Sequence, residues 1–190
     1  MGSSSSSLPA LKAMTTPIPG GANAVMGHWF VQGVVPTIFE KNAYNSLEHY
    51  EWLDEEAGRL RITFNYRTGD YDGSKPASEM GKESCVLQDG QVINTATGAE
   101  WTVRPRLGGC PIPVSLPYII LQAEPMSHMC VGYPDRSYLW IMSRRPAIDE
   151  ELYSQLVKRA VDEWGYQEEK ILRVRQFWDD KDFPKSPVAE

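Results

Sequence analysis

Short runs in which apolar and polar residues alternate dominate the middle of the chain. The clearest is LRITFNYR, residues 60–67, where four apolar or aromatic side chains alternate with four polar ones. A period of two places successive side chains on opposite faces of a β-strand, so this run predicts a strand with one dry and one wet face. Comparable runs separated by turn residues predict strands at 27–35, 43–54, 60–67, 77–87, 99–107, 114–124, 128–133 and 137–143.

One segment has a different period. From Ile148 to Trp164 apolar residues recur at intervals of three and four, which predicts an amphipathic helix. Asp149 stands at the expected N-cap, and Gly165 stands where helices commonly end. Ile148 and Tyr153 have the spacing of a hydrophobic staple. A short final strand is expected at 170–176, so the predicted order is eight strands, one helix and one strand.

The short turns between the strands indicate how the strands are arranged. They favour antiparallel neighbours, because a parallel pair needs a long crossover. We therefore expect an all-β fold, an eight-stranded antiparallel up-and-down barrel, whose closure removes exposed strand edges. The C-terminal helix would bury its apolar side on the outer wall of the barrel. The interior of such a barrel is wide enough for one small ligand.

The two ends of the chain have a different composition from the middle. Residues 1–24 are rich in Ser, Pro and Gly and are expected to form a disordered leader, and the charged residues 179–190 a flexible tail. One folded domain is thus expected over 25–178. The leader fits the myristoylation pattern at Gly2 and Ser6, but an unmodified Ser-rich leader or part of a transit peptide is the favoured interpretation. No secretory signal and no stretch of about 20 apolar residues is found, so we expect a location in the cytoplasm or at a membrane periphery, with a plastid left open.

Composition and charge exclude several classes of function. The chain has 190 residues, a net charge of −6 and a pI near 5.2, and its basic residues do not cluster, which argues against a nucleic-acid-binding protein. The three cysteines and the three histidines show no metal-ligand spacing, and no catalytic or cofactor-binding motif is found. We therefore predict no metal, no cofactor and no catalytic site.

Three short motifs, in order and beside the expected strands, carry a family resemblance. Gly27-His28-Trp29 resembles the G-x-W motif of the lipocalins, YPDRSY (133–138) their second signature, and SRRP (143–146) their third. The stretch SYLWIMSRRP, 137–146, followed by the helix, is especially similar to bacterial outer-membrane lipocalins and plant temperature-induced lipocalins. The resemblance covers about 25–176.

The resemblance implies a barrel calyx that binds a fatty acid, lysophospholipid, sterol or pigment without catalysis, for transport or sequestration, with a role in membrane maintenance or stress protection. The alternative is an enzyme on the same fold that acts on a lipid or xanthophyll, and a prostaglandin-isomerase type would need an inward-pointing cysteine. The bacterial lipoproteins carry a lipobox cysteine that has no counterpart here, so outer-membrane anchoring is not implied. Peripheral membrane contact and the choice between monomer and homodimer stay open.

The resemblance also assigns roles to residues. It places Arg144 over the ring of Trp29, next to Gly27, as the floor of the barrel, and leaves Arg145 in solvent. The candidate lining residues are Ile62, Phe64, Tyr118, Ile120, Met129 and Trp140. A slip of one residue would turn each of them to the opposite face, so plain core packing is the alternative for each.

Two further segments are candidates for contact with a ligand. Glu48 and His49 could form an inward polar pair that orients a head group or serves acid–base chemistry, although one solvated and one hydrogen-bonded residue is the plainer interpretation. Pro36, Ile38 and Phe39 could form an apolar lid, with burial in the core as the alternative. The Pro- and Gly-rich segment 108–117 is expected to form a loop at the mouth of the barrel.

Overall fold

The computed structural model of the chain describes residues 8–37, 40, 42–71, 75, 79, 81–107 and 109–178. Its strands are β1 (Gly27–Val35), β2 (Ala43–Asp54), β3 (Arg59–Thr68), β4 (Lys82–Val92), β5 (Glu100–Leu107), β6 (Cys110–Pro111), β7 (Leu116–Glu124), β8 (His128–Gly132), β9 (Leu139–Ser143) and β10 (Leu172–Arg173). The α-helix is α1 (Glu150–Asp162), and the 3-10 helices η1 (Ala22–Val25) and η3 (Glu168–Lys170) are single turns.

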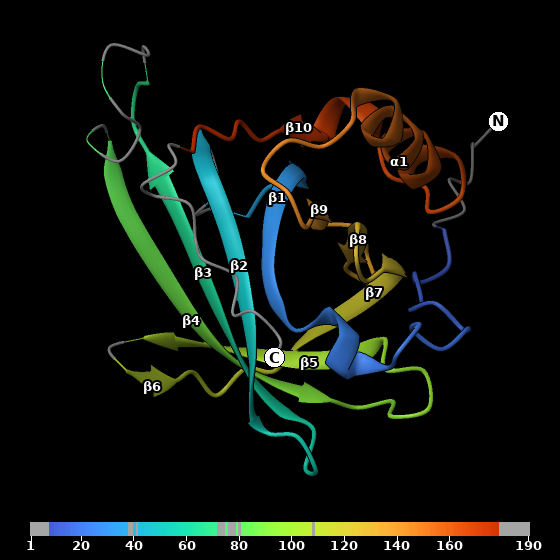
Figure 1. Cartoon of the computed structure of the whole chain (residues 1–190). Helices are drawn as coiled ribbons and strands as arrows, with labels where there is room; N and C mark the ends of the chain where they lie inside the picture. Colours follow the sequence, from blue (N-terminus) through green and yellow to red (C-terminus); the bar gives the residue numbers. More distant parts are fainter. Residues whose placement is uncertain are drawn as a thin grey trace, which may run out of the picture.

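Eight of these strands form a closed barrel (Figure 1). Neighbours along the sheet order β1-β2-β3-β4-β5-β7-β8-β9 pair antiparallel, and β9 pairs with β1 to close the sheet. The other two strands are additions, because β6 pairs with β5 and β10 pairs with β1. The predicted eight-stranded antiparallel barrel with one external helix is confirmed.

The alternation in β3 separates the inside of the barrel from the outside. Leu60, Ile62, Phe64 and Tyr66 are buried, while the residues between them are partly exposed. A cluster of buried side chains from most of the barrel strands fills the interior around Trp29 and Tyr118. A second cluster lies outside, where Leu156 and Ala160 of α1 cover apolar residues of β7, β8 and β9. The helix thus takes the outer wall and leaves the interior to other residues.

The local signals for the helix act as predicted. The carboxylate of Asp149 accepts a hydrogen bond from the amide of Leu152 at 3.0 Å, which satisfies one of the free amides at the helix start. The helix ends at Asp162, and Gly165 adopts a φ of +74°, a conformation that favours glycine. Of the helices that the structure describes, none combines the length and the apolar character needed to cross a bilayer.

Two strands differ from the prediction by more than two residues at an end. The fourth strand runs over Lys82–Val92 instead of 77–87. The alternation of more and less buried residues continues at its end, where Gly90 and Val92 are buried. The last strand is limited to Leu172–Arg173. Residues 174–178 follow β1 and β2 without forming a regular strand, and separate hydrogen bonds hold them there. One of these joins the amide of Val174 to the carbonyl of Gln32 at 2.9 Å.

Residues 8–24 are ordered, so the prediction of a leader disordered to residue 24 is wrong for this part. The amides of Leu11, Met14 and Ile18 donate to the carbonyls of Pro134, Ile120 and Thr97 at 2.8, 2.8 and 2.9 Å, and Ile18 is only 2% exposed. The segment has no helical or strand period because it is anchored at separate points. Residues 1–7, with Gly2 and Ser6, and the predicted tail 179–190 lie outside the described residues.

Candidate ligand-binding site

Arg144 and Trp29 close one end of the barrel. The guanidinium carbon of Arg144 lies 3.7 Å from the ring centroid of Trp29, which is fully buried. Arg144 also donates hydrogen bonds to the carbonyls of Pro125, His28 and Ala24 at 2.7, 2.9 and 3.0 Å. Burial lowers the pKa of Arg144 to about 10, so it stays charged at neutral pH. This contact is the barrel floor expected from the sequence.

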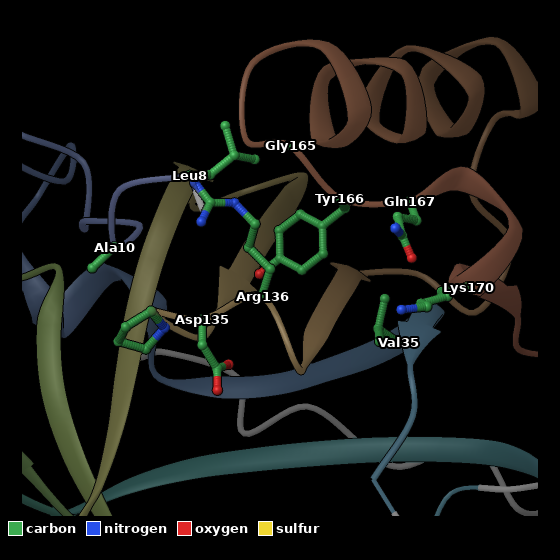
Figure 2. A pocket seen from close by; sticks show the side chains of 10 residues that line it. Leu8, Ala10, Val35, Asp135, Arg136, Gly165, Tyr166, Gln167 and Lys170 are labelled. Atoms are coloured by element: carbon green, nitrogen blue, oxygen red, sulfur yellow. The ribbon is translucent and has the colours of Figure 1, made fainter. Parts of the chain in front are cut away.

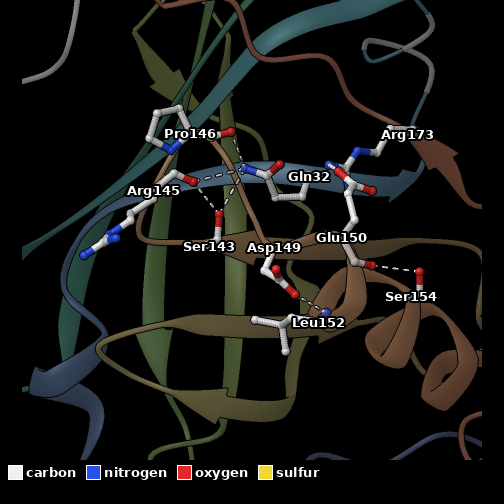
Figure 3. A network of polar contacts seen from close by, with 9 residues as sticks. All are labelled: Gln32, Ser143, Arg145, Pro146, Asp149, Glu150, Leu152, Ser154 and Arg173. Atoms are coloured by element: carbon white, nitrogen blue, oxygen red, sulfur yellow. Dashed lines mark hydrogen bonds and ion pairs between the residues drawn. The ribbon is translucent and has the colours of Figure 1, made fainter.

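The residues around this floor leave little space. Gly27 has a φ of +92°, and a Cβ atom there would lie 3.4 Å from Nη1 of Arg144. The side chain of Arg145 is exposed. The carbonyl of this residue and that of Pro146 accept hydrogen bonds from the buried amide of Gln32 at 3.1 and 3.0 Å, which fixes the exit from β9 towards α1 (Figure 3).

A cavity of about 260 Å³ lies in the other half of the barrel, towards the loops that join β1 to β2, β5 to β7 and β8 to β9. Apolar and aromatic side chains from five strands, β3, β4, β5, β7 and β9, form most of its wall. The residues that line it are Thr37, Glu40, Glu48, Phe64, Val86, Gln88, Val103, Pro105, Leu116, Pro117, Tyr118, Tyr133, Tyr138 and Trp140.

The structure divides the six predicted lining residues into two groups. Phe64, Tyr118 and Trp140 line the cavity. Ile62, Ile120 and Met129 also lie in the barrel, but they are fully buried in the cluster around Trp29 and do not line the cavity. Their prediction as lining residues is corrected: they fill the interior. Sequence alternation shows which side of a strand is apolar but not how far along the barrel a residue lies.

Glu48 brings a carboxyl group into this apolar interior. It lies opposite Phe64 in the pairing of β2 with β3 and is 2% exposed. Its Oε2 accepts hydrogen bonds from the hydroxyls of Tyr118, at 3.0 Å, and Tyr50, and these two hydroxyls also contact each other. His49 belongs to the opposite face, where its ring centroid lies 4.4 Å from that of His28. The expected inward pair of Glu48 and His49 is therefore not formed: Glu48 bonds to two phenols inside the barrel, and His49 does not take part.

Glu40 is a second buried carboxyl group at the cavity. Its Oε1 accepts from the indole N–H of Trp140 at 2.8 Å, and its Oε2 from the backbone amide of Thr37 at 2.9 Å. Sequence reasoning missed Glu40, Tyr50 and Tyr138. A signal existed for Tyr50 and Tyr138, since a strand places residues 48 and 50, and likewise 138 and 140, on one face.

Burial dominates the electrostatics of the two carboxyl groups. It raises the pKa of Glu48 to about 7 against the opposing effect of the hydrogen bonds from Tyr50 and Tyr118, and the charge of Glu40 raises it further. Burial likewise raises the pKa of Glu40. None of the described residues that line the cavity is Lys, Arg or His, so no lining cation offsets these charges.

The cysteines lie away from the cavity. Cys130 is buried beneath α1, where burial raises its pKa to about 12, and Cys85 and Cys110 are exposed. The enzyme type that needs an inward cysteine therefore has no support. Within the described ranges, no three His, Cys, Asp or Glu residues are grouped as metal ligands. In the predicted lid Pro36 is partly exposed, and Ile38 and Phe39 lie outside the described residues.

A second hollow, of about 530 Å³, lies outside the barrel between the leader, the 133–136 turn and the end of α1 (Figure 2). Arg136 donates hydrogen bonds to the carbonyls of Trp164 and of Pro9, the latter at 2.9 Å. The hydroxyl of Tyr166 donates to the carbonyl of Tyr138 at 2.8 Å. These contacts join three segments of the chain, so we interpret this region as a structural joint.

Comparisons with known proteins agree with this architecture. The family model described as a lipocalin-like domain matches residues 22–176. Temperature-induced lipocalin-1 of Arabidopsis thaliana is 46% identical over 66 residues, 34% of this chain and 35% of that protein. Outer membrane lipoprotein Blc of Citrobacter freundii is 43% identical over 49 residues, 26% of this chain and 27% of that protein. The matches therefore span about a third or less of these curated relatives.

A solved structure with the same fold is insecticyanin from the tobacco hornworm Manduca sexta. It superposes with a TM-score of 0.62 at 13% identity, over 92% of this chain and 90% of that one. The family match covers most of the chain and includes the barrel floor, the cavity and the external helix. The chain belongs to the lipocalin family, which is known for binding small hydrophobic ligands and whose members are typically not catalysts.

Proposed function

We propose that this protein binds a small hydrophobic ligand in the barrel cavity, without catalysis, in order to carry or sequester it. The observation that supports this most strongly is the apolar cavity of about 260 Å³, walled by residues such as Phe64, Val86 and Trp140. Removal of a ligand's apolar surface from water would supply the binding free energy, at roughly 25 cal/mol per Å².

The shape of the interior suggests the route of entry. Ile62, Ile120 and Met129 fill the barrel between the cavity and the Trp29–Arg144 floor. A ligand would therefore enter and leave at the opposite end, near Thr37, Tyr133 and Tyr138. The volume is just below the range of about 300–1,000 Å³ that is usual for small-molecule pockets. Among fatty acids, lysophospholipids, sterols and pigments, we therefore propose ligands whose buried part is a single acyl chain or a small ring system.

Mass spectrometry of an organic extract of the protein from its own source tests this proposal. Calorimetric titration of delipidated protein with a series of such ligands provides the affinity. Val86→Trp should fill the cavity and abolish binding, and Leu53→Trp, at a position that is 53% exposed, should leave binding unchanged. A source-purified protein that is reproducibly empty and gives no heat with the whole series would contradict the proposal.

One observation favours a second candidate function. Glu48, with a pKa of about 7 and hydrogen bonds from two phenols, has the properties of a general acid or base. An enzyme acting on a lipid or xanthophyll would use it to move a proton on the bound substrate. Conversion of the extracted ligand by wild-type protein and not by Glu48→Gln would favour this function, and recovery of the ligand unchanged would exclude it for that ligand.

The proposed setting is membrane maintenance or stress protection, at a membrane surface or in the adjoining cytoplasm. It is supported by the names of two relatives, one temperature-induced and one an outer-membrane lipoprotein. Sedimentation with lipid vesicles, combined with light scattering to distinguish a monomer from a homodimer, would test it. Complete recovery of the protein in the supernatant at every vesicle composition would count against a role at the membrane.

A further inference from the structure

We propose that the cavity selects amphiphiles whose polar end is a cationic amine, over those that end in a carboxylate, through an ion pair with Glu48. The proposal rests on the proposed function, since it assumes that the cavity is the binding site. It is carried by three features: the unused oxygen of Glu48, the charge balance of the cavity wall, and the aromatic rings beside the carboxyl group.

The first feature is the hydrogen bonding of Glu48. The hydroxyls of Tyr50 and Tyr118 both contact Oε2, and no donor among the described residues reaches Oε1. Nδ1 of His28 is an example of an atom that is fully enclosed and has no hydrogen-bond partner, and Oε1 of Glu48 does not belong to this group. Oε1 is therefore open towards the cavity and available to a donor on a ligand.

The available protons decide which kind of ligand fits. Tyr50, Tyr118 and Glu48 place three oxygen atoms in mutual contact, and the two phenols supply two protons between them. When Glu48 is ionised, both protons are used within the cluster, between a phenol and Oε2 or between the two phenols. The cluster then offers an acceptor and no free donor, so an ammonium group finds a partner and a carboxylate does not.

The charges that face Glu48 act in the same direction. Glu40, before β2, adds a second carboxyl group whose two oxygens are already occupied by Thr37 and Trp140. The other titratable groups at the cavity wall are the phenols of Tyr118, Tyr133 and Tyr138, and burial raises the pKa of Tyr118 and Tyr133. In surroundings of low dielectric this negative charge attracts a cation and repels an anion more strongly than it would in water.

Aromatic rings beside the carboxyl group also favour a cation. Tyr118 and Trp140 stack with ring centroids 6.0 Å apart, and Tyr138 lies 6.1 Å from Trp140. All three residues line the cavity. The faces of such rings attract an ammonium group, and they also provide apolar surface for the rest of the ligand.

Calorimetry at pH 8 with decylamine, decanol and decanoate, each below its micelle concentration or solubility limit, tests the inference with three head groups on one alkyl chain. We expect decylamine to bind at least about tenfold more tightly than decanoate. Glu48→Gln should lower the affinity for decylamine about tenfold and leave that for decanol nearly unchanged. Glu51→Gln, the same change at an exposed position of β2, is the control and should alter neither.

The outcomes separate the two proposals. Binding of decanoate as tight as that of decylamine, or equal decylamine binding by wild-type and Glu48→Gln protein, would overturn the amine selectivity and leave the carrier function standing. If none of the three ligands binds, the amine selectivity is overturned, and the carrier function is decided by the wider series of acyl, sterol and pigment ligands. The comparison of the three ligands on wild-type protein decides the matter even if a variant does not fold.

The pH dependence supplies an independent readout. Below about pH 7 Glu48 takes up a proton and loses its attraction for an ammonium group. The affinity of wild-type protein for decylamine should therefore fall between pH 8 and pH 6, and its affinity for decanol should not. An affinity for decylamine that stays constant over this range would contradict the ion pair.

Discussion

Two adjacent arginines at the end of β9 have different roles because one points inward and one points outward. Arg144 lies over Trp29 and satisfies three carbonyl groups, whereas Arg145 is exposed. Truncation of a buried donor leaves its acceptors without partners, and this costs more than loss of a solvated charge. The contribution of each arginine thus follows from its contacts and not from its charge.

Arg144→Ala should lower the free energy of unfolding by at least about 2 kcal/mol, because it removes a cation–π contact and three charge-assisted hydrogen bonds. Arg145→Ala should change it by less than about 0.5 kcal/mol. Chemical denaturation of both variants beside the wild type measures the difference. Equal midpoints for the two variants would disprove the structural role of Arg144.

Glu48 should make stability depend on pH. Its pKa in the folded protein, about 7, lies above the ordinary value of 4.5, so the fold favours the protonated form. The stabilisation is complete below pH 4.5 and is lost as the pH rises through 7, an effect of the order of 3 kcal/mol. Glu48→Gln keeps an acceptor for the two phenols and does not titrate. Its melting temperature relative to the wild type should rise between pH 5 and pH 8; a constant difference would show that the pKa of Glu48 is not raised in the folded protein.

At the scale of elements, the order of leader residues 8–24 is the feature that amino-acid composition does not predict. Ser, Pro and Gly predict disorder, yet three backbone hydrogen bonds tie residues 8–24 to Thr97, Ile120 and Pro134. The side chains of Arg136 and Arg144 add hydrogen bonds to the same segment. The strands and the helix were predictable because their periods of two and three to four reflect burial of one face. A segment anchored at single points has no period, and its order depends on contacts that only the folded barrel creates.

Ile18→Ala should therefore destabilise the domain by about 2–4 kcal/mol, as expected for truncation of a buried isoleucine. Leu8→Ala, at a position that is 61% exposed, should have little effect. Thermal unfolding of the two variants measures the contribution of the leader. Equal melting temperatures would show that the leader does not dock on the barrel in solution.

At the scale of the whole molecule, the barrel and its floor were predictable, but the chemistry of the cavity was only partly so. The predicted contact between Arg144 and Trp29 is present, with the guanidinium carbon 3.7 Å from the ring centroid. The joint position of Glu48, Tyr50 and Tyr118 depends on the register of β2 and β7, which lie in different parts of the sheet. A one-residue slip inverts every side chain, so alternation alone predicts a dry interior but not a carboxyl group within it.

Closure of the barrel also constrains its order of assembly. Val35 of β1 pairs with Leu139 of β9, roughly a hundred residues further along the chain, and contacts of such long sequence separation slow folding. During synthesis β1 leaves the ribosome long before β9 and β10, the strands that pair with one of its edges. Until then that edge and the apolar side chains of Phe30 and Val34 lack these neighbours, so the nascent chain passes through a period of exposure to aggregation or chaperone binding.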